Sequence, residues 1–218
     1  MCCLQRTLSH FLAVCATRSV SAMSLMTDII QPPPKSSLLK FIWQFIQNPK
    51  SVGAIAPSGA VLSRRMATGL GANSKVLELG GGTGTLTRGI ANAGVSGSNL
   101  TVIEMNPDFI RSLTEQFPGA RIVDHSAFEI ETLPEEVCDL DAVVSGLPLV
   151  NMSRDNHRAI MRGAFSRLKA GGCYRQFTYR PRCPIGPDVL KEFGLKATYE
   201  AMALRNLPPA FVYRIERA

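Results

Sequence analysis

The chain has 218 residues, of which 45% are hydrophobic, and a net charge of +7. This length suits one α/β domain with short extensions. The only uninterrupted apolar run near the N-terminus, residues 11–16, falls far short of the roughly 20 residues that span a bilayer. Six cysteines include no Cys-x-x-Cys pair, which argues against a zinc site or a redox dithiol. We therefore expect a soluble or peripheral monomer with free thiols and no metal.

Charge is distributed unevenly along the chain. Residues 1–75 carry eight basic side chains and one acidic side chain, residues 76–153 carry three and eleven, and residues 154–218 carry thirteen and five. Basic flanks around an acidic centre suit a phosphate-bearing partner, either a nucleic acid or an anionic membrane. A generally solvated basic surface is the alternative interpretation.

Residues 1–35 are expected to form a leader outside the folded domain. The first 27 residues contain two arginines, no acid and many Ser and Thr residues, as targeting segments do. Met23 and Met26 are equally compatible with a start codon assigned too far upstream. Three prolines at 32–34 then interrupt the chain before the first helix.

Residues 36–48 have the pattern of an amphipathic helix. Spaced at 100° per residue, the apolar side chains fall in one wide arc and the polar ones occupy the rest. The arc, the tryptophan within it and the absence of any acid over residues 29–77 favour binding to an anionic membrane. Packing on the domain core would give the same periodicity. The residues expected to meet the membrane are Lys40, Phe41, Trp43 and Phe45.

Hydrophobic periodicity predicts alternating strands and helices after this segment. Alternation of this kind predicts a doubly wound, mostly parallel α/β sheet, and two final strands with no helix between them predict an antiparallel C-terminal hairpin. The expected helices are 58–68, 85–92, 107–116, 154–168 and 187–193. The expected strands are 75–79, 100–103, 121–123, 142–145, 173–179, 195–205 and 210–216.

The first strand runs into a glycine-rich loop, Gly80-Gly81-Gly82-Thr83-Gly84, and a helix follows. Such a loop lets the backbone approach a ligand closely and aims helix N-terminal amides at its anionic group. The dinucleotide fingerprint Gly-x-Gly-x-x-Gly uses the same physics, but here the glycines are spaced by two. Glu78 adds a carboxylate suited to a cationic ligand group, and Glu104, which ends the next strand, can accept hydrogen bonds from ribose hydroxyls.

This stretch resembles motif I of class I methyltransferases, which implies S-adenosylmethionine as cofactor and Glu104 as the ribose-binding acid. After the third strand, many relatives have Gly-Asp-Ala where this chain has His125-Ser126-Ala127, so a hydroxyl stands where an acid is common. The resemblance implies a seven-stranded, Rossmann-like sheet. The cofactor-binding residues that it implies are Ser58, Glu78, Gly80, Gly82, Thr83, Gly84, Glu104, Met105, Ser126 and Ala127.

The candidate catalytic segment Ser145-Gly146-Leu147-Pro148 lies where the fourth strand opens onto the methyl group. In enzymes that methylate adenine in RNA or DNA, this place resembles Asn/Asp-Pro-Pro-Tyr, whose amide binds the exocyclic amine and whose aromatic ring stacks on the flipped base. Here Ser145 replaces the amide and Leu149 replaces the aromatic residue. Base recognition of that kind is therefore not expected.

Several segments together resemble the soluble bacterial phosphatidylethanolamine N-methyltransferases of the rhizobial phospholipid N-methyltransferase type. The resemblance covers about residues 36–218 and implies a methyltransferase domain over that range, including the helix 36–48. It implies stepwise transfer of up to three methyl groups to the headgroup amine of phosphatidylethanolamine, toward phosphatidylcholine. The segments are residues 48–58, residues 145–149, Gln176-Phe177-Thr178-Tyr179 with Cys183-Pro184, and residues 206–210 with Val212-Tyr213.

This resemblance implies an enzyme that is cytoplasmic and peripheral at the inner face of the cytoplasmic membrane, with no nucleic-acid partner. Methylation of ornithine lipid is a close variant. An RNA (adenine) methyltransferase that uses its basic flanks is the second reading, and a non-enzymatic binding module that retains the cofactor fold is the third.

N-methylation needs a neutral amine whose lone pair points at the methyl group. Tyr179 is the first candidate to orient the amine and to hold the methylated cation by cation–π attraction. The alternative is a tyrosine at a strand end with a solvated hydroxyl. His125 and His157 are other possible bases, and Arg180 and Arg182 are candidates for binding the lipid phosphate.

Overall fold

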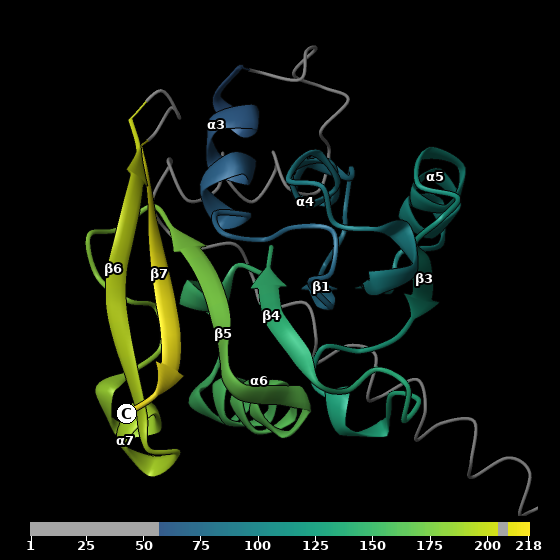
Figure 1. Ribbon diagram of the computed structural model, residues 1–218. Coiled ribbons are helices and arrows are strands. Elements are labelled where there is room, and N and C mark those ends of the chain that lie inside the picture. The colour runs from purple at the N-terminus through teal and green to yellow at the C-terminus, as the bar shows by residue number, and fades with distance from the viewer. Residues whose placement is uncertain (1–56, 205–208) are drawn as a thin grey trace, which may run out of the picture. The chain divides into compact units, whose positions relative to one another are not determined.

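The structure is a computed structural model that describes residues 57–204 and 209–218, with only the backbone described at Pro57 and Ser58 (Figure 1). The predicted leader and the predicted helix 36–48, with Lys40, Phe41, Trp43 and Phe45, lie outside the described residues. In chain order the elements are α3 (Pro57–Met66), β1 (Val76–Leu79), α4 (Thr85–Asn92), η2 (Gly97–Asn99), β2 (Leu100–Glu104), α5 (Pro107–Gln116), β3 (Arg121–Asp124), η3 (Ile130–Thr132), β4 (Leu140–Ser145), η4 (Leu149–Asn151), α6 (Arg154–Arg167), β5 (Leu168–Thr178), α7 (Pro187–Glu192), β6 (Leu195–Ala203) and β7 (Ala210–Arg217).

The strands form one seven-stranded sheet in the order β3-β2-β1-β4-β5-β7-β6. Neighbours from β3 to β5 pair in parallel, whereas β7 pairs antiparallel with both β5 and β6. The predicted fold is therefore confirmed, including its C-terminal hairpin. The order reverses at β1 and β4, and in open α/β sheets ligands bind beyond the carboxyl ends of the strands at such a switch point.

Helices cover both faces of this sheet because its strands are apolar on both sides. One core joins the sheet to α3, α4 and α5 through residues such as Met66, Ile90 and Leu113. The other joins it to α6 and α7 through residues such as Met161 and Val189. Figure 1 shows α3 and α4 on the opposite side of the sheet from α6 and α7. Burial on both faces explains why the central strands read as nearly continuous apolar runs.

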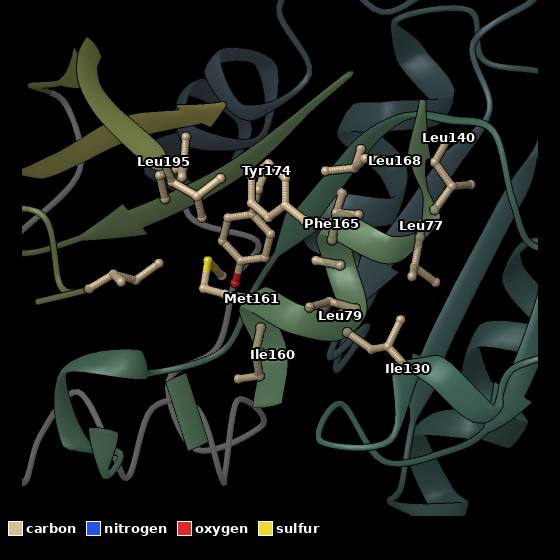
Figure 2. Packing of buried hydrophobic residues seen from close by; sticks show 14 of the residues in the cluster. Leu77, Leu79, Ile130, Leu140, Ile160, Met161, Phe165, Leu168, Tyr174 and Leu195 are labelled. Carbon is tan, nitrogen blue, oxygen red and sulfur yellow. The ribbon is translucent and has the colours of Figure 1, made fainter. Parts of the chain in front are cut away.

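Tyr174 occupies the second core, where Figure 2 shows its ring among Met161, Phe165 and Leu195. The whole side chain is buried. Its hydroxyl donates a hydrogen bond to Oε1 of Gln176 at 3.1 Å. This bond offsets the free-energy cost of burying a phenol hydroxyl without a partner. The tyrosine thus links the apolar core to a polar group near the carboxyl end of β5.

Local signals set the helix starts. The Asn106 side chain caps α5 by accepting a hydrogen bond from the Asp108 amide at 2.9 Å, and Pro107 occupies the first turn. Ser153 caps α6 by accepting from the Asn156 amide at 3.2 Å. Both helices begin where the sequence predicts, since each of these caps is encoded within a few residues.

The fifth strand differs from its predicted range of 173–179. The chain becomes extended directly at the end of α6, and Leu168 already pairs with Leu140. Pairing then shifts register before Cys173 aligns with Ala142, and Gly171 in the intervening segment has a φ of 77°. A register irregularity of this kind leaves no signature in apolar periodicity, so the sequence places the strand start too late.

A partly buried ion pair joins strands β5 and β6. Arg175 Nε lies 3.0 Å from Glu200 Oε2, and Nη2 lies 3.1 Å from Oε1, a bidentate arrangement. Arg175 also donates to the main-chain carbonyl of Met66 at 3.4 Å, which joins β5 and β6 to the end of α3. Within the described ranges, no helix has the length and apolar character needed to cross a membrane.

Candidate active site

The glycine loop, Gly80–Gly84, leaves the carboxyl end of β1 with a backbone that only glycine adopts easily. The φ angles of Gly80, Gly82 and Gly84 are 75°, 52° and 79°. The Gly80 amide donates to the Ile103 carbonyl at 2.9 Å, so the loop starts hydrogen-bonded to β2. The loop then turns into α4 at Gly84.

The glycines of this loop serve two different purposes. A Cβ atom at Gly81 would lie 2.6 Å from Val102 Cγ1, and one at Gly84 would lie 2.8 Å from the Phe117 ring, so these two positions allow tight packing. A Cβ atom at Gly82 would meet nothing within 4 Å. The open space at Gly82 is therefore where a ligand can approach the backbone.

Glu104 at the end of β2 faces the same space. Its Oε2 accepts a hydrogen bond from the Gly82 amide at 2.9 Å, and its Oε1 accepts from the amides of Met105 and Asn106, each at 2.9 Å. These bonds fix the carboxylate orientation beside the loop. Each carboxylate oxygen has two lone-pair sites, so Oε2 can also accept from a ribose hydroxyl.

Glu78 is a buried acid beneath the glycine loop, and its side chain has no exposed surface. Burial raises the pKa of its carboxyl from the ordinary value of 4.5 to about 8, against the lowering effect of nearby Thr87 and with a further increase from the charge of Glu104. Neither carboxyl oxygen nor the Thr87 hydroxyl makes a hydrogen bond of good geometry to a described residue. A cationic ligand group would favour ionisation of this acid, so the site fits the ammonium end of S-adenosylmethionine.

The β4 loop, residues 146–153, contacts the glycine loop directly. The Gly146 amide donates to the Leu79 carbonyl at 2.9 Å. A Cβ atom at Gly146 would lie 2.9 Å from the Gly80 carbonyl oxygen, and a Cβ atom at Gly80 would lie 2.8 Å from Leu147 Cδ2. Each loop therefore needs a glycine where it meets the other.

Polar side chains of β4 and β5 hold the β4 loop by hydrogen bonds. Gln176 Nε2 donates to the Leu147 carbonyl at 2.9 Å and to the Phe177 carbonyl at 3.0 Å, and its Oε1 accepts from Tyr174. Ser145 is fully buried and accepts a hydrogen bond from the Leu147 amide at 3.3 Å. Gln176 belongs to one of the sequence motifs, but the sequence alone does not show its role. Its position opposite Ser145 across β4 and β5 supplies that role.

The two histidines considered as bases have local partners. His157 is buried, and its Nε2 lies 2.8 Å from the Leu149 carbonyl, so it supports the β4 loop. His125 Nε2 lies 2.9 Å from the Glu129 carbonyl and 3.2 Å from the Thr132 hydroxyl. Both rings thus stabilise chain turns, which favours the structural interpretation over that of a general base.

Of the other predicted cofactor residues, Met105 follows the end of β2, and Ser126 and Ala127 follow the end of β3. Met105 is 59% exposed, which is unusual for a large apolar side chain and consistent with a ligand that covers it. Ser126 accepts a hydrogen bond from the Phe128 amide at 3.2 Å, and Ala127 is partly buried behind it. The Thr83 hydroxyl lies 3.3 Å from that of Thr85. The Ser58 side chain is outside the described atoms.

The predicted acceptor residues lie at the end of β5. Tyr179 directly follows this strand, is partly buried, and meets the Phe177 ring edge-on at a centroid distance of 5.6 Å. Arg180 and Arg182 are exposed in the loop that follows. Gln176, three residues before Tyr179, pairs with Ser145. The topology therefore brings Tyr179 to the same sheet edge as the β4 loop.

Known proteins resemble this chain in sequence and in fold. An ornithine lipid N-methyltransferase from Singulisphaera acidiphila is 29% identical over 180 residues, 79% of this chain and 92% of that protein. The structure of a TehB-like SAM-dependent methyltransferase from Corynebacterium glutamicum aligns with a TM-score of 0.56 and 16% identity over 82% of this chain and 97% of that one. A Burkholderia thailandensis 1,6-didemethyltoxoflavin-N1-methyltransferase with bound S-adenosylhomocysteine aligns with a TM-score of 0.56 and 14% identity, over 85% and 92% of the two chains.

Gly82→Val is expected to lower the affinity for S-adenosylhomocysteine at least a hundredfold, because the added side chain enters the open space at the loop. Gly194→Val is the matched control, since Gly194 has a φ of 61° and its added Cβ atom also meets nothing within 4 Å. Both variants carry a similar backbone strain. Calorimetric titration of both variants checks the prediction, and equal losses of affinity would contradict it.

Glu78→Gln is expected to remove a pH dependence of stability in the cofactor-free protein. The folded state holds a proton on Glu78 up to about pH 8, whereas the unfolded state releases it near pH 4.5, so wild-type stability falls as the pH rises between these values and levels off above them. Each unit of pKa shift corresponds to about 1.4 kcal/mol. In thermal unfolding from pH 5 to pH 9, the stability of the variant relative to the wild type should rise up to about pH 8 and then stay constant. A constant difference would refute the buried-acid assignment.

The family comparison covers the part of the chain that carries this site. A family model described as a methyltransferase domain matches residues 76–172, from the start of β1 into β5. This range contains the glycine loop, Glu104 and the β4 loop, and the fold around it is that of the solved methyltransferases. Residues 76–172 therefore form a methyltransferase domain with a class I fold, and S-adenosylmethionine is its cofactor.

Proposed function

We propose that this methyltransferase acts on the headgroup amine of a membrane lipid. The observation that carries the proposal is the similarity to the ornithine lipid N-methyltransferase, which extends over most of both chains. That similarity reaches well beyond the matched methyltransferase domain. It therefore includes segments that cofactor binding alone does not explain.

The β4 loop supports an acceptor other than a nucleobase. The motif places its amide three residues before its aromatic ring, so with the ring position at Leu149 the amide position falls on Gly146, which has no side chain, rather than on Ser145. Ser145 itself is buried and bonded to the loop backbone. The position of the stacking ring is taken by Leu149, which is 1% exposed and packs in the core with α6. Neither side chain is available to a flipped base, so the RNA alternative loses its usual means of recognition.

Amine methylation needs the lone pair of a neutral nitrogen. S-adenosylmethionine supplies an electrophilic methyl group when bound, and a nitrogen–carbon bond forms as the sulfur–carbon bond breaks. If the lipid amine titrates near a lysine amine, deprotonating it at pH 7 costs roughly 4 to 5 kcal/mol. A site of low dielectric constant lowers that cost. Tyr179 lies at the end of β5, where its ring can face the amine and then the methylated cation.

Two lipids are candidates for the substrate. The sequence segments at residues 48–58 and 206–210 resemble phosphatidylethanolamine N-methyltransferases, whereas the relative from Singulisphaera acidiphila is an ornithine lipid N-methyltransferase. Both headgroups present an amine beside an apolar anchor. Phosphatidylethanolamine also carries a phosphate, for which Arg180 and Arg182 are the proposed ligands.

Incubation with radiolabelled S-adenosylmethionine is expected to label lipid and not RNA. Purified phosphatidylethanolamine, ornithine lipid and total RNA are offered separately, and products are resolved by thin-layer chromatography and by gel. Label in either lipid supports the proposal, and the ratio of the two rates identifies the headgroup. Label confined to RNA, or no label in any lipid, would refute it.

Tyr179→Phe is expected to retain part of the activity, whereas Tyr179→Ala loses at least tenfold in kcat, because the ring and not the hydroxyl faces the cation. The phenylalanine variant serves as the matched control for packing against Phe177. Initial rates with the labelled lipid and circular dichroism of both variants provide the check. Full activity of the alanine variant would assign Tyr179 to a structural role.

A further inference from the structure

The corner of the sheet at the carboxyl ends of β5 and β6 combines exposed apolar and cationic side chains. We call it the hairpin corner, and it consists of the exposed residues Arg180, Arg182, Tyr199 and Leu204 and the partly buried residues Phe211 and Tyr213. Strand register brings these segments together, because Phe211 of β7 pairs with both Thr178 of β5 and Met202 of β6. In Figure 1 the end of β5 lies beside β7, which in turn lies beside β6.

Two large apolar side chains of the corner are more than half exposed. Leu204 is 70% exposed, the highest value among the large apolar side chains of the described ranges, and Tyr199 is 51% exposed. Tyr199 contacts Phe211 and Tyr213 at ring centroid distances of 6.4 and 6.0 Å. Exposed tyrosine rings are common on protein surfaces that meet the headgroup layer of a membrane.

The charge of the corner is positive and is not neutralised by described side chains. Arg180 and Arg182 are exposed, and neither forms an ion pair with any residue of the described ranges. The segments 178–186 and 199–213 contain a single acid, Glu200. The carboxylate of Glu200 is held by Arg175 in the bidentate pair. An anionic surface would therefore meet uncompensated positive charge.

The opposite edge of the sheet has a different character. Ion pairs neutralise it near the amino ends of the strands, where Lys169 contacts Asp141 at 2.5 Å and Lys196 contacts Glu216 at 3.3 Å. None of the large apolar side chains that are exposed in the described ranges lies at that edge. The amino ends of the strands therefore suit contact with water, whereas the hairpin corner suits contact with a charged, partly apolar surface.

We propose that the hairpin corner docks on an anionic phospholipid surface, with Leu204 and the tyrosine cluster entering the headgroup layer and the two arginines binding lipid phosphates. This inference deepens the proposed function on which it rests, because the corner adjoins Tyr179 and would place the acceptor site over lipid headgroups. It involves residues separate from the predicted helix 36–48. Membrane contact is thus assigned to the folded domain itself.

Flotation of the full chain with vesicles tests the proposal. The wild type should bind vesicles of phosphatidylglycerol and phosphatidylcholine more tightly than vesicles of phosphatidylcholine alone, and binding should weaken with salt. Tyr199→Glu/Leu204→Glu and Arg180→Glu/Arg182→Glu should each weaken binding at least tenfold. Arg111→Glu/Arg162→Glu is the matched control for the arginine variant, because it makes the same change in charge at exposed positions of α5 and α6. It should stay within twofold of the wild type.

Activity on a short-chain lipid amine dispersed in detergent separates this inference from the proposed function. Tyr199→Glu/Leu204→Glu should retain wild-type activity on that substrate and lose activity on vesicles. If both corner variants bind vesicles as tightly as the wild type does, the docking proposal is wrong, whichever substrate the enzyme methylates. A wild-type protein that binds RNA but not anionic vesicles would also contradict the docking proposal. Loss of vesicle binding in the variants, together with no lipid methylation by the wild type, would support the corner and refute the proposed function.

Discussion

The contact between the glycine loop and the β4 loop is the constraint on which the site depends. Gly80 can approach Leu147, and Gly146 can approach the Gly80 carbonyl, only because neither glycine has a side chain. β1 and β4 are neighbours at the point where the strand order reverses, so their ends open side by side. The position of the cofactor loop and that of the acceptor loop are therefore fixed by one contact rather than separately.

Interior polar groups lie on both faces of the sheet near this contact and have different roles. Gln176 and His157 hold carbonyl groups of the β4 loop, and Tyr174 holds Gln176 within the core beside α6. On the other side, Glu78 lies under α4 without a good hydrogen-bond partner among the described residues. The first set is satisfied and rigid, whereas Glu78 is costly to ionise unless a cation binds. Satisfied groups shape the site, and the unsatisfied one marks where a ligand is needed.

Sequence alone predicted most of the fold, because strands buried on both faces and capped helices carry local signals. The bounds of α4 and α5 were predicted to the residue. The glycine loop was predicted from its glycine-rich sequence between a strand and a helix, and Glu104 from its place at the end of the next strand. The start of β5 was misplaced, since the pairing of Leu168 with Leu140 depends on register and not on periodicity. The role of Gln176 and the Arg175–Glu200 pair were also missed. Each joins residues from different strands, and only the assembled sheet shows which partners meet.

A crystal structure of the full chain with S-adenosylhomocysteine tests the central claim most directly, since both loops should contact the same ligand. We expect a ribose bound to Glu104, backbone contact at Gly82, the ammonium group beside Glu78, and the sulfur atom facing Gly146 and Leu147. A ligand bound elsewhere on the sheet, or one that contacts the glycine loop but faces away from the β4 loop, would contradict it.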